Sequence, residues 1–272
     1  MRTRSAAPPH KDDVDVALRV THLGVSFRGL RALDDVTFDL PSGGISAVIG
    51  PNGAGKTTLF NCVSGIYRHE GSVTLGERSL DRLNADQRAS AGVARTFQTP
   101  ILLDQLTVLD NVMLGAHPWT RGGMIANLLG VRARQNEDRA REAAWDMLGS
   151  LNMQHVAGRT VGSLAHADRR RVEVARALAA RPQLLMLDEP AAGLSAEEAN
   201  ELLGLTAEIG AATGMTVVLV EHDVALVMRL ARRIVVLDAG RLLAQGSAAE
   251  VAADPAVISA YLGDYSGEAS TT

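Results

Sequence analysis

Cysteine and lysine are both scarce in this chain of 272 residues. The single cysteine, Cys62, excludes a disulfide within the chain and any metal site built from several cysteines. Only two lysines accompany 25 arginines: Lys11 lies in a polar N-terminal stretch, and Lys56 lies in a glycine-rich motif. Such a rare lysine indicates a position that needs a compact ammonium group rather than a planar guanidinium.

Long apolar runs are missing as well, and so is a strong excess of positive charge. No stretch of about 18 uncharged apolar residues occurs, so the chain is not expected to span a bilayer by itself. Residues 1–15 contain charges and prolines without an apolar core, and they are interpreted as a flexible tail rather than a signal peptide. A net charge of -4 gives no indication of a nucleic-acid partner.

Short apolar runs of strand length are separated by helical patterns. Residues 45–49 (ISAVI), 184–187 (LLML) and 216–220 (TVVLV) each lead directly into glycine or polar residues. This alternation predicts an α/β fold with a parallel sheet and a functional site at the carboxyl edge of its strands. Further short strands, at residues 25–27, 36–40 and 72–75, predict an antiparallel accessory sheet.

The middle third of the chain has helical spacing. Residues 108–114 and 139–151 are expected to be helices of a helical subdomain, and residues 117–136 are interpreted as an inserted or mobile segment. Two capping boxes mark later helix starts, Ser195 with Glu198 and Ser247 with Glu250. Between these helices, a hairpin is predicted from strands at 234–237 and 242–244.

Residues 50–57 (GPNGAGKT) match the phosphate-binding motif GxxxxGK[ST] between a predicted strand and a helix predicted over 56–66. Its glycines let backbone N–H groups converge on phosphate oxygens, and the helix N-terminus favours negative charge. Lys56 is expected to reach the β and γ phosphates and Thr57 to bind Mg²⁺. The expected nucleotide-binding residues are Gly50, Pro51, Asn52, Gly53, Ala54, Gly55, Lys56, Thr57 and Thr58.

A carboxylate pair follows residues 184–187. Asp188 is a hard oxygen ligand suited to Mg²⁺ beside the phosphates, and Glu189 is placed to polarise the attacking water. Acidic residues also end many strands as solvated caps, but a phosphate-binding loop upstream favours the catalytic interpretation. The cofactors predicted from these motifs are therefore ATP and Mg²⁺.

Together these motifs resemble the nucleotide-binding subunit of ABC transporters over nearly the whole chain. The resemblance implies a P-loop NTPase core with a parallel sheet, an N-terminal antiparallel β subdomain and an inserted α-helical signature subdomain at about 99–182. It implies a single ATPase domain over 16–264, followed by a flexible tail at 265–272. It also implies catalytic roles for Glu189, His222 and Gln98, a further metal contact for Gln98, and adenine stacking on Phe27.

The phrases FNCVSGIYR, ARTFQ, LDEPAAGLS, EHDVALVM and AYLG narrow the resemblance to the branched-chain amino-acid (Liv-type) importers, specifically the longer of their two ATPases. The implied function is ATP hydrolysis coupled to uptake of branched-chain amino acids or a similar small solute. The implied partners are transmembrane permease subunits, a second ABC ATPase and, indirectly, an extracytoplasmic solute-binding protein. The implied location is the cytoplasmic face of the membrane, and the loop at 99–103 (TPILL) is expected to contact the permease.

Two motifs depart from the ABC pattern. The signature, usually LSGGQ, reads LAHAD here, so Ala165 replaces a serine and Ala167 replaces a glycine. Ser195 stands where aspartate is usual in the following D-loop. We expect a weaker signature, because Ala165 has no hydroxyl and the methyl of Ala167 hinders a close backbone approach.

Two other functions are compatible with a phosphate-binding loop. A soluble ABC ATPase acting on nucleic acid or ribosomes is disfavoured, because the sequence has one nucleotide-binding domain, no long coiled coil and no basic face. A non-catalytic nucleotide-binding regulator is disfavoured by the presence of Glu189. No nucleic-acid partner is therefore expected.

Overall fold

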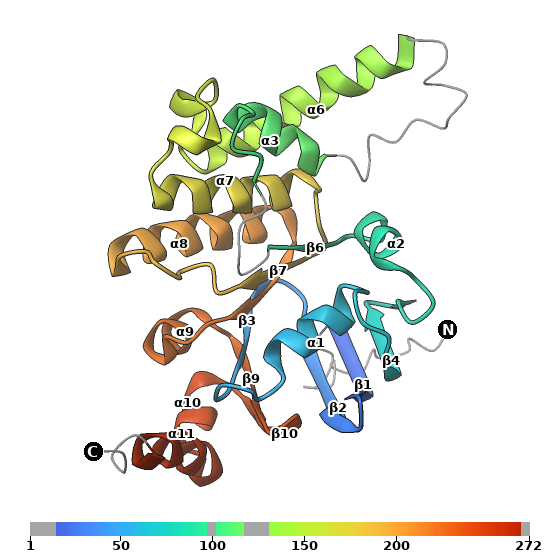
Figure 1. The fold of residues 1–272 in the computed structure, drawn as a ribbon, viewed down its shortest axis with the longest axis vertical. Coiled ribbons are helices and arrows are strands. Elements are labelled where there is room, and N and C mark those ends of the chain that lie inside the picture. The colour runs from blue at the N-terminus through green and yellow to red at the C-terminus, as the bar shows by residue number, and fades with distance from the viewer. Residues whose placement is uncertain (1–14, 97–101, 117–130, 268–272) are drawn as a thin grey trace, which may run out of the picture.

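The computed structural model describes residues 15–96, 102–116 and 131–267, with the side chains of 131–135 and 262–267 left out of the description. The described residues form two sheets with helices packed around them (Figure 1). The larger sheet has the strand order β10-β9-β3-β8-β7-β6. Its strands are β3 (Gly44–Ile49), β6 (Val93–Arg95), β7 (Leu184–Asp188), β8 (Thr216–Val220), β9 (Arg233–Asp238) and β10 (Arg241–Gly246).

The larger sheet is parallel from β9 to β6, and only β10 pairs in the antiparallel direction. All residues of β7 and β8 are buried, as expected for strands covered on both faces. Strand β8 lies between β3 and β7, with Val220 opposite both Val48 and Asp188. The carboxyl ends of these three strands therefore lie side by side, which confirms the predicted parallel sheet.

The smaller sheet is antiparallel and has the order β2-β1-β4-β5. It confirms the predicted accessory sheet, although β1 and β2 are longer than the expected strands. The strands are β1 (Val16–Phe27), β2 (Leu30–Pro41), β4 (Glu70–Leu75) and β5 (Arg78–Ser79).

Helices gather at both ends of the molecule. Figure 1 shows α3, α6 and α7 beyond α8 at one end, and α10 and α11 near the C-terminus at the other. The helices α3, α6 and α7 of the expected helical subdomain therefore lie together. The helices are α1 (Lys56–Val63), α2 (Ala85–Ser90), α3 (Val108–Gly115), α6 (Val131–Ser150), α7 (His166–Ala179), α8 (Ala196–Thr213), α9 (Val224–Leu230), α10 (Ala248–Ala253) and α11 (Pro255–Gly267), with the 3₁₀ turns η1 (Gln154–Val156) and η2 (Val161–Ser163).

Helix boundaries differ from the expected ones at three places. Helix α1 ends at Val63 rather than 66, because Gly65 takes a positive φ of 79° and its N–H bonds the Cys62 carbonyl. Helix α6 begins at Val131, so the end of the expected inserted segment is helical; its part at 117–130 lies outside the described residues. Helix α11 continues to Gly267, three residues beyond the expected domain end.

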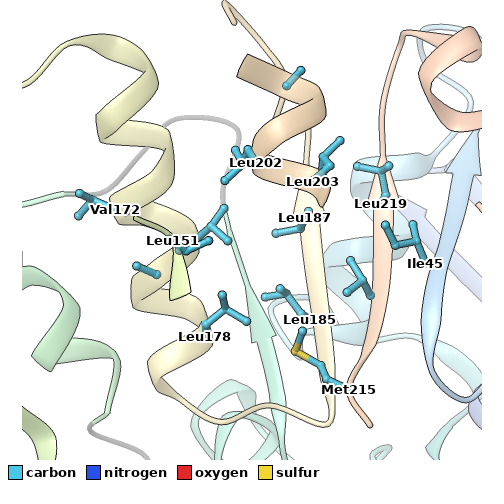
Figure 2. Packing of buried hydrophobic residues seen from close by; sticks show 14 of the residues in the cluster. Ile45, Leu151, Val172, Leu178, Leu185, Leu187, Leu202, Leu203, Met215 and Leu219 are labelled. Atoms are coloured by element: carbon cyan, nitrogen blue, oxygen red, sulfur yellow. The ribbon is translucent and has the colours of Figure 1, made fainter. Parts of the chain in front are cut away.

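Alternate residues of the central strands enter two separate buried clusters. Ile45, Leu185 and Leu219 pack with helices α7 and α8 on one face (Figure 2). Val48 and Val218 pack on the other face with α1 and the smaller sheet. The strands are therefore held from both sides, and the loops that follow them are anchored on a fully packed core.

Among the described residues, no helix combines the length and the apolar character that a membrane-spanning helix needs.

Candidate functional site

The loop of residues 50–55 joins β3 to α1 at the carboxyl edge of the larger sheet. It opens on a cavity of about 540 Å³. The expected site residues that line this cavity are Asn52, Gly53, Ala54, Gly55, Lys56, Thr57, Thr58, Glu189 and His222. A cavity of this size, bounded by a glycine-rich loop and a helix N-terminus, is suited to a nucleotide.

Two glycines of the loop are required by close backbone contacts. A Cβ on Gly50 would lie 2.1 Å from the Leu237 carbonyl oxygen, and one on Gly55 would lie 3.0 Å from the Ala32 carbonyl oxygen. Gly55 also has a φ of 100° at the N-cap of α1, a conformation that favours glycine. The loop therefore presses against β9 and β2.

Lys56 is the first residue of α1, and its side chain folds back over the loop. Nζ donates hydrogen bonds to the carbonyl oxygens of Gly50 at 2.6 Å and Pro51 at 2.9 Å. Burial lowers the pKa of this ammonium, while the Glu189 and Asp188 carboxylates raise it. The Lys56 ammonium therefore lies against the loop, and its expected role at the phosphates stays a prediction.

Asp188 ends β7 and is 2% exposed. Its Oδ2 accepts a hydrogen bond from the Arg95 guanidinium at 2.7 Å, and Arg95 also donates to Asn61 Oδ1 of α1 at 2.6 Å. Arg95 was not identified from the sequence, since nothing in its neighbourhood signals a contact 93 residues away. It balances the charge of Asp188 inside the protein.

These residues fit Mg²⁺ by the chemistry of their donors. Mg²⁺ takes oxygen ligands and is usually bound through one or two carboxylates together with phosphates and water. Asp188 supplies a buried carboxylate, and Thr57 supplies a hydroxyl at the cavity wall.

Glu189 and His222 come together from the loops that follow β7 and β8. His222 Nε2 lies 2.6 Å from Glu189 Oε1, although the two residues are 33 positions apart. The Glu189 side chain is 16% exposed and that of His222 is 52% exposed. Both line the cavity beside the phosphate-binding loop, so two predicted catalytic residues lie at one site.

Phe27 and Gln98 are placed differently. Gln98 lies outside the described residues, so its expected roles stay predictions. Phe27 is 41% exposed and lines a separate hollow with Tyr67, whose ring it meets edge-on at a centroid distance of 5.0 Å. Adenine stacking on Phe27 therefore stays a prediction. The cavity wall includes residues that the sequence motifs did not indicate: Leu30, Arg31, Ala32, Ala239 and Gly240.

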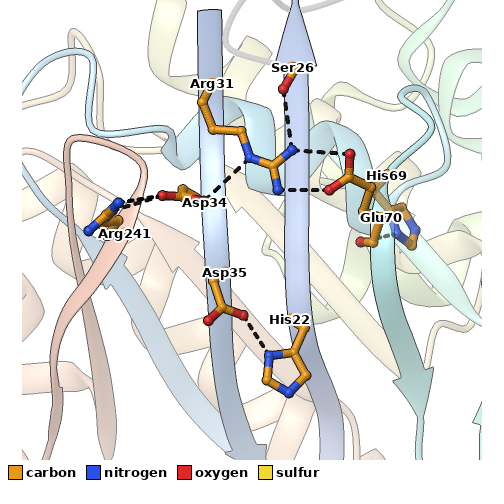
Figure 3. Close-up of polar contacts among 8 residues, drawn as sticks. All are labelled: His22, Ser26, Arg31, Asp34, Asp35, His69, Glu70 and Arg241. Atoms are coloured by element: carbon orange, nitrogen blue, oxygen red, sulfur yellow. Dashed lines mark hydrogen bonds and ion pairs between the residues drawn. The ribbon is translucent and has the colours of Figure 1, made fainter.

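Arg31 holds its place at the cavity wall through ion pairs on the smaller sheet (Figure 3). Its guanidinium donates two hydrogen bonds to Glu70, at 2.7 and 3.1 Å. Asp34 lies between Arg31 and Arg241, and hydrogen bonding from Arg241 lowers the pKa of its carboxyl. This chain of charges links β10 and β4 through β2, but it is exposed, so its contribution to stability is small.

The altered signature begins helix α7 without a side-chain cap. Ala165 is the N-cap residue and makes no side-chain hydrogen bond to the helix. His166 Nε2 lies 3.0 Å from the carbonyl oxygen of Ala192, so the signature contacts the D-loop of its own chain. Ala167 lies inside α7 and is not among the residues with positive φ, so glycine is not required there by the backbone.

Tyr261 is a further contact that the site motifs did not indicate. It lies on α11, where its hydroxyl oxygen accepts a hydrogen bond from the backbone of Gly50. Burial raises the pKa of this phenol to about 12. The C-terminal helix is therefore connected directly to the first residue of the phosphate-binding loop.

Comparison with known proteins gives consistent matches. The ABC transporter family model matches residues 33–192, and the model for branched-chain amino acid ATP-binding cassette transporters matches residues 241–265, which include Tyr261. The high-affinity branched-chain amino acid transport ATP-binding protein LivG of Salmonella typhimurium is 42% identical over 251 residues, which is 91% of this chain and 98% of LivG. The high-affinity branched-chain amino acid transport ATP-binding protein BraF of Pseudomonas aeruginosa is 39% identical over 249 residues, which is 91% of this chain and 98% of BraF.

A solved structure, the ADP conformation of an ATP-binding cassette of an ABC transporter, superposes with a TM-score of 0.80 at 29% identity. The superposition covers 91% of this chain and 99% of the solved chain. The fold agrees with that of this solved cassette. The chain belongs to the ABC transporter family, as one of its ATP-binding cassettes.

Proposed function

We propose that this chain is the ATP-hydrolysing subunit of an importer of branched-chain amino acids or a similar small solute. The observation that carries the proposal is the short contact between Glu189 and His222 beside the loop that holds Lys56. The solute class is supported by the names of LivG and BraF and by the C-terminal family match. The chain works beside permease subunits at the cytoplasmic face of the membrane.

The mechanism follows from where the charges lie. Loop N–H groups and Lys56 hold the phosphates, while the N-terminus of α1 adds further positive potential. Asp188 and Thr57 would hold Mg²⁺, which would supply positive charge to neutralise the phosphates. Glu189 takes a proton from the attacking water, and His222, within hydrogen-bond distance, orients that carboxylate and contacts the γ phosphate.

A second ATPase completes the site in this proposal. The signature of the partner faces the nucleotide held by this chain, and the signature at Ala165 faces the partner's nucleotide. Because Ala165 has no hydroxyl to donate, we expect the two sites to hydrolyse at different rates, with faster hydrolysis at the site built on Glu189.

The test is an assembled transporter. The chain is purified with its permease subunits, phosphate release is measured, and uptake into proteoliposomes is compared across branched-chain, polar and charged amino acids. Uptake of branched-chain amino acids driven by ATP, abolished by Glu189→Gln, supports the proposal. Phosphate release without any solute uptake, or recovery of the chain with nucleic acid rather than with permease subunits, contradicts it.

A further inference from the structure

Glu221 is a buried carboxylate that the mechanism above does not use. It follows directly after β8, is 6% exposed, and does not line the nucleotide cavity. Burial of an ionisable group is unfavourable unless the protein provides hydrogen bonds for it. Its partners therefore indicate what the group does.

Each oxygen of the Glu221 carboxylate accepts a backbone hydrogen bond from a different loop. The Ala191 N–H donates to Oε1 at 2.7 Å, and the His222 N–H donates to Oε2 at 3.2 Å. Ala191 lies two residues after Glu189 in the loop that follows β7. The side chain therefore joins the loop that bears the predicted base to the loop that bears its histidine.

The backbone at Glu189 needs such support. Glu189 has a φ of 50°, in the left-handed region that a residue with a long side chain rarely adopts. Its N–H donates to the Val220 carbonyl at 2.9 Å, and its carbonyl accepts from the Ala192 N–H at 3.2 Å. These two bonds fix Glu189 on either side, and the bond from Ala191 to Glu221 fixes the peptide between them.

We propose that Glu221 is a positioning residue for hydrolysis, which holds the Glu189 and His222 loops at the spacing that brings Glu189 Oε1 within hydrogen-bond distance of His222 Nε2. This inference rests on the proposed function, in which Glu189 is the base. Glu221 acts through the backbone of both loops, so its loss alters the geometry of the reaction and leaves the phosphate-binding loop intact.

A carboxylate fits this position better than a neutral side chain. Two N–H donors converge on it, and only a carboxylate offers an acceptor oxygen to each. Glutamine can accept from Ala191, but it would then direct its own NH₂ group at the His222 N–H. Leucine is similar in size and can accept neither bond. Leucine at this position is therefore expected to lower the hydrolysis rate more than glutamine does.

The experiment uses Glu221→Leu and Glu221→Gln in the assembled transporter. Asp81→Asn is the matched control, because Asp81 also accepts a backbone hydrogen bond, from Val73 at 2.7 Å, but lies in the turn after β5 of the smaller sheet. We expect kcat to fall about tenfold to a hundredfold for Glu221→Leu, the size of effect that a small misplacement of catalytic groups produces. The kcat of Glu221→Gln should fall less. KM and ATP affinity should be unchanged in both Glu221 variants, and Asp81→Asn should keep the original kcat.

A double variant separates positioning from a general loss of structure. Once Glu189→Gln has removed the base, adding Glu221→Leu should lower the residual rate no further, because the two residues act through one group. The inference is contradicted if the two substitutions lower the hydrolysis rate additively. It is also contradicted if Asp81→Asn lowers kcat as much as Glu221→Gln does. If Glu221→Leu fails to fold, an original kcat for Glu221→Gln overturns the inference. Absence of phosphate release from the unmodified transporter instead contradicts the proposed function itself.

Discussion

Lys56 is the residue whose removal most directly tests nucleotide binding. Its ammonium already lies against the loop, bound to the Gly50 and Pro51 carbonyls, and it is 7% exposed. A hydrogen bond to a charged group contributes about 1.5 to 3 kcal/mol, so Lys56→Ala should weaken ATP binding by about tenfold to a hundredfold. Calorimetric titration of the purified chain measures this change, and an unaltered Kd contradicts the assignment of the loop.

Glu189→Gln separates binding from chemistry. The amide keeps the size of the side chain and can still hydrogen-bond His222, but it cannot accept the proton of the attacking water. Loss of such a base typically lowers the rate about 10²- to 10⁴-fold. ATP binding should persist and trap the closed pair of ATPases, which size-exclusion chromatography detects. Hydrolysis at the original rate in the assembled transporter would show that another residue is the base.

Single residues could be predicted from the sequence where chemistry fixes their spacing. Lys56 and Asp188 could be named from the sequence, because phosphate binding needs a lysine at the start of the helix after a glycine-rich loop and metal binding needs a carboxylate at the end of a buried strand. Arg95 and Glu221 could not be identified from the sequence, because each contacts residues that are close to it only in the folded chain. Glu221 stands beside His222 in the sequence, but its burial and its bond to Ala191 appear only when β7 and β8 lie side by side.

At the scale of elements, the N-terminus of α7 is uncapped. Ala165 has the extended conformation of an N-cap, with φ −64° and ψ 160°, and has no side-chain oxygen to accept a helix N–H. Ala165→Ser should add that bond and raise the free energy of unfolding by about 0.5 to 2 kcal/mol. Urea denaturation of the isolated chain measures it. Ser247→Ala at the capped start of α10 is the reverse control and should lower stability by a similar amount.

The same variant tests the altered signature. If Ala165 limits hydrolysis of the partner's nucleotide, Ala165→Ser should also speed turnover of the assembled transporter. The single substitution is better than one combined with Ala167→Gly, since Ala167 is helical and glycine inside a helix costs about 1 kcal/mol. A more stable chain with unchanged or slower turnover would mean that the contact from His166 to Ala192 already gives a working signature.

The loop before α3 is the predicted permease contact. Ile101 lies outside the described residues, and Leu102 packs partly buried against the core, so aspartate at Leu102 would disturb folding. Leu103 is 48% exposed, and its backbone is held by two hydrogen bonds with the Asn111 side chain. Leu103→Asp should therefore abolish solute uptake while ATP binding and melting temperature stay unchanged.

Ile258→Asp is the control for this variant. Ile258 is 45% exposed, similar to Leu103, but it lies on α11 at the opposite end of the molecule (Figure 1). It should leave uptake unchanged. Normal uptake by Leu103→Asp, or equal losses from both variants, contradicts a specific permease contact at Leu103.

Elements were predictable where local pattern and tertiary environment agree. The strands β7 and β8 have apolar runs that are buried on both faces, and Ser195 and Ser247 mark helix starts through bonds made within four residues. The ends were less predictable. Helix α1 ends early because of the turn at Gly65, and α6 begins earlier than its apolar spacing suggests.

At the scale of the whole molecule, the larger sheet separates two buried clusters. The nucleotide site lies at the carboxyl edge of this sheet, next to both clusters. Cys62 belongs to the core between α1 and the smaller sheet and is fully buried. Burial raises the pKa of its thiol to about 12. In the folded chain only about one thiol in 10⁴ is then ionised at pH 8, whereas an exposed cysteine, with a pKa of about 8.5, is about one quarter thiolate.

This lone cysteine should report unfolding of the whole chain. A thiol reagent at pH 8 should label Cys62 only when the protein opens, so the labelling rate measures the population of open molecules. The unfolded chain ionises the thiol above pH about 8.5 while the folded chain keeps its proton up to about 12, so stability should fall as pH rises through this window. Labelling should accelerate accordingly.

MgATP should slow the labelling by a factor that its affinity sets. At a concentration one hundred times Kd, a ligand that binds only the folded state stabilises it by about 2.7 kcal/mol, so labelling should slow about a hundredfold. Lys56→Ala, with a Kd raised about tenfold to a hundredfold, should reduce that protection to about two- to tenfold at the same ATP concentration. Rapid labelling that ATP does not change would mean that the packing around Cys62 opens locally while the nucleotide site stays folded. Protection that follows the measured Kd of each variant would instead show that nucleotide binding and the packing around Cys62 belong to one cooperative unit.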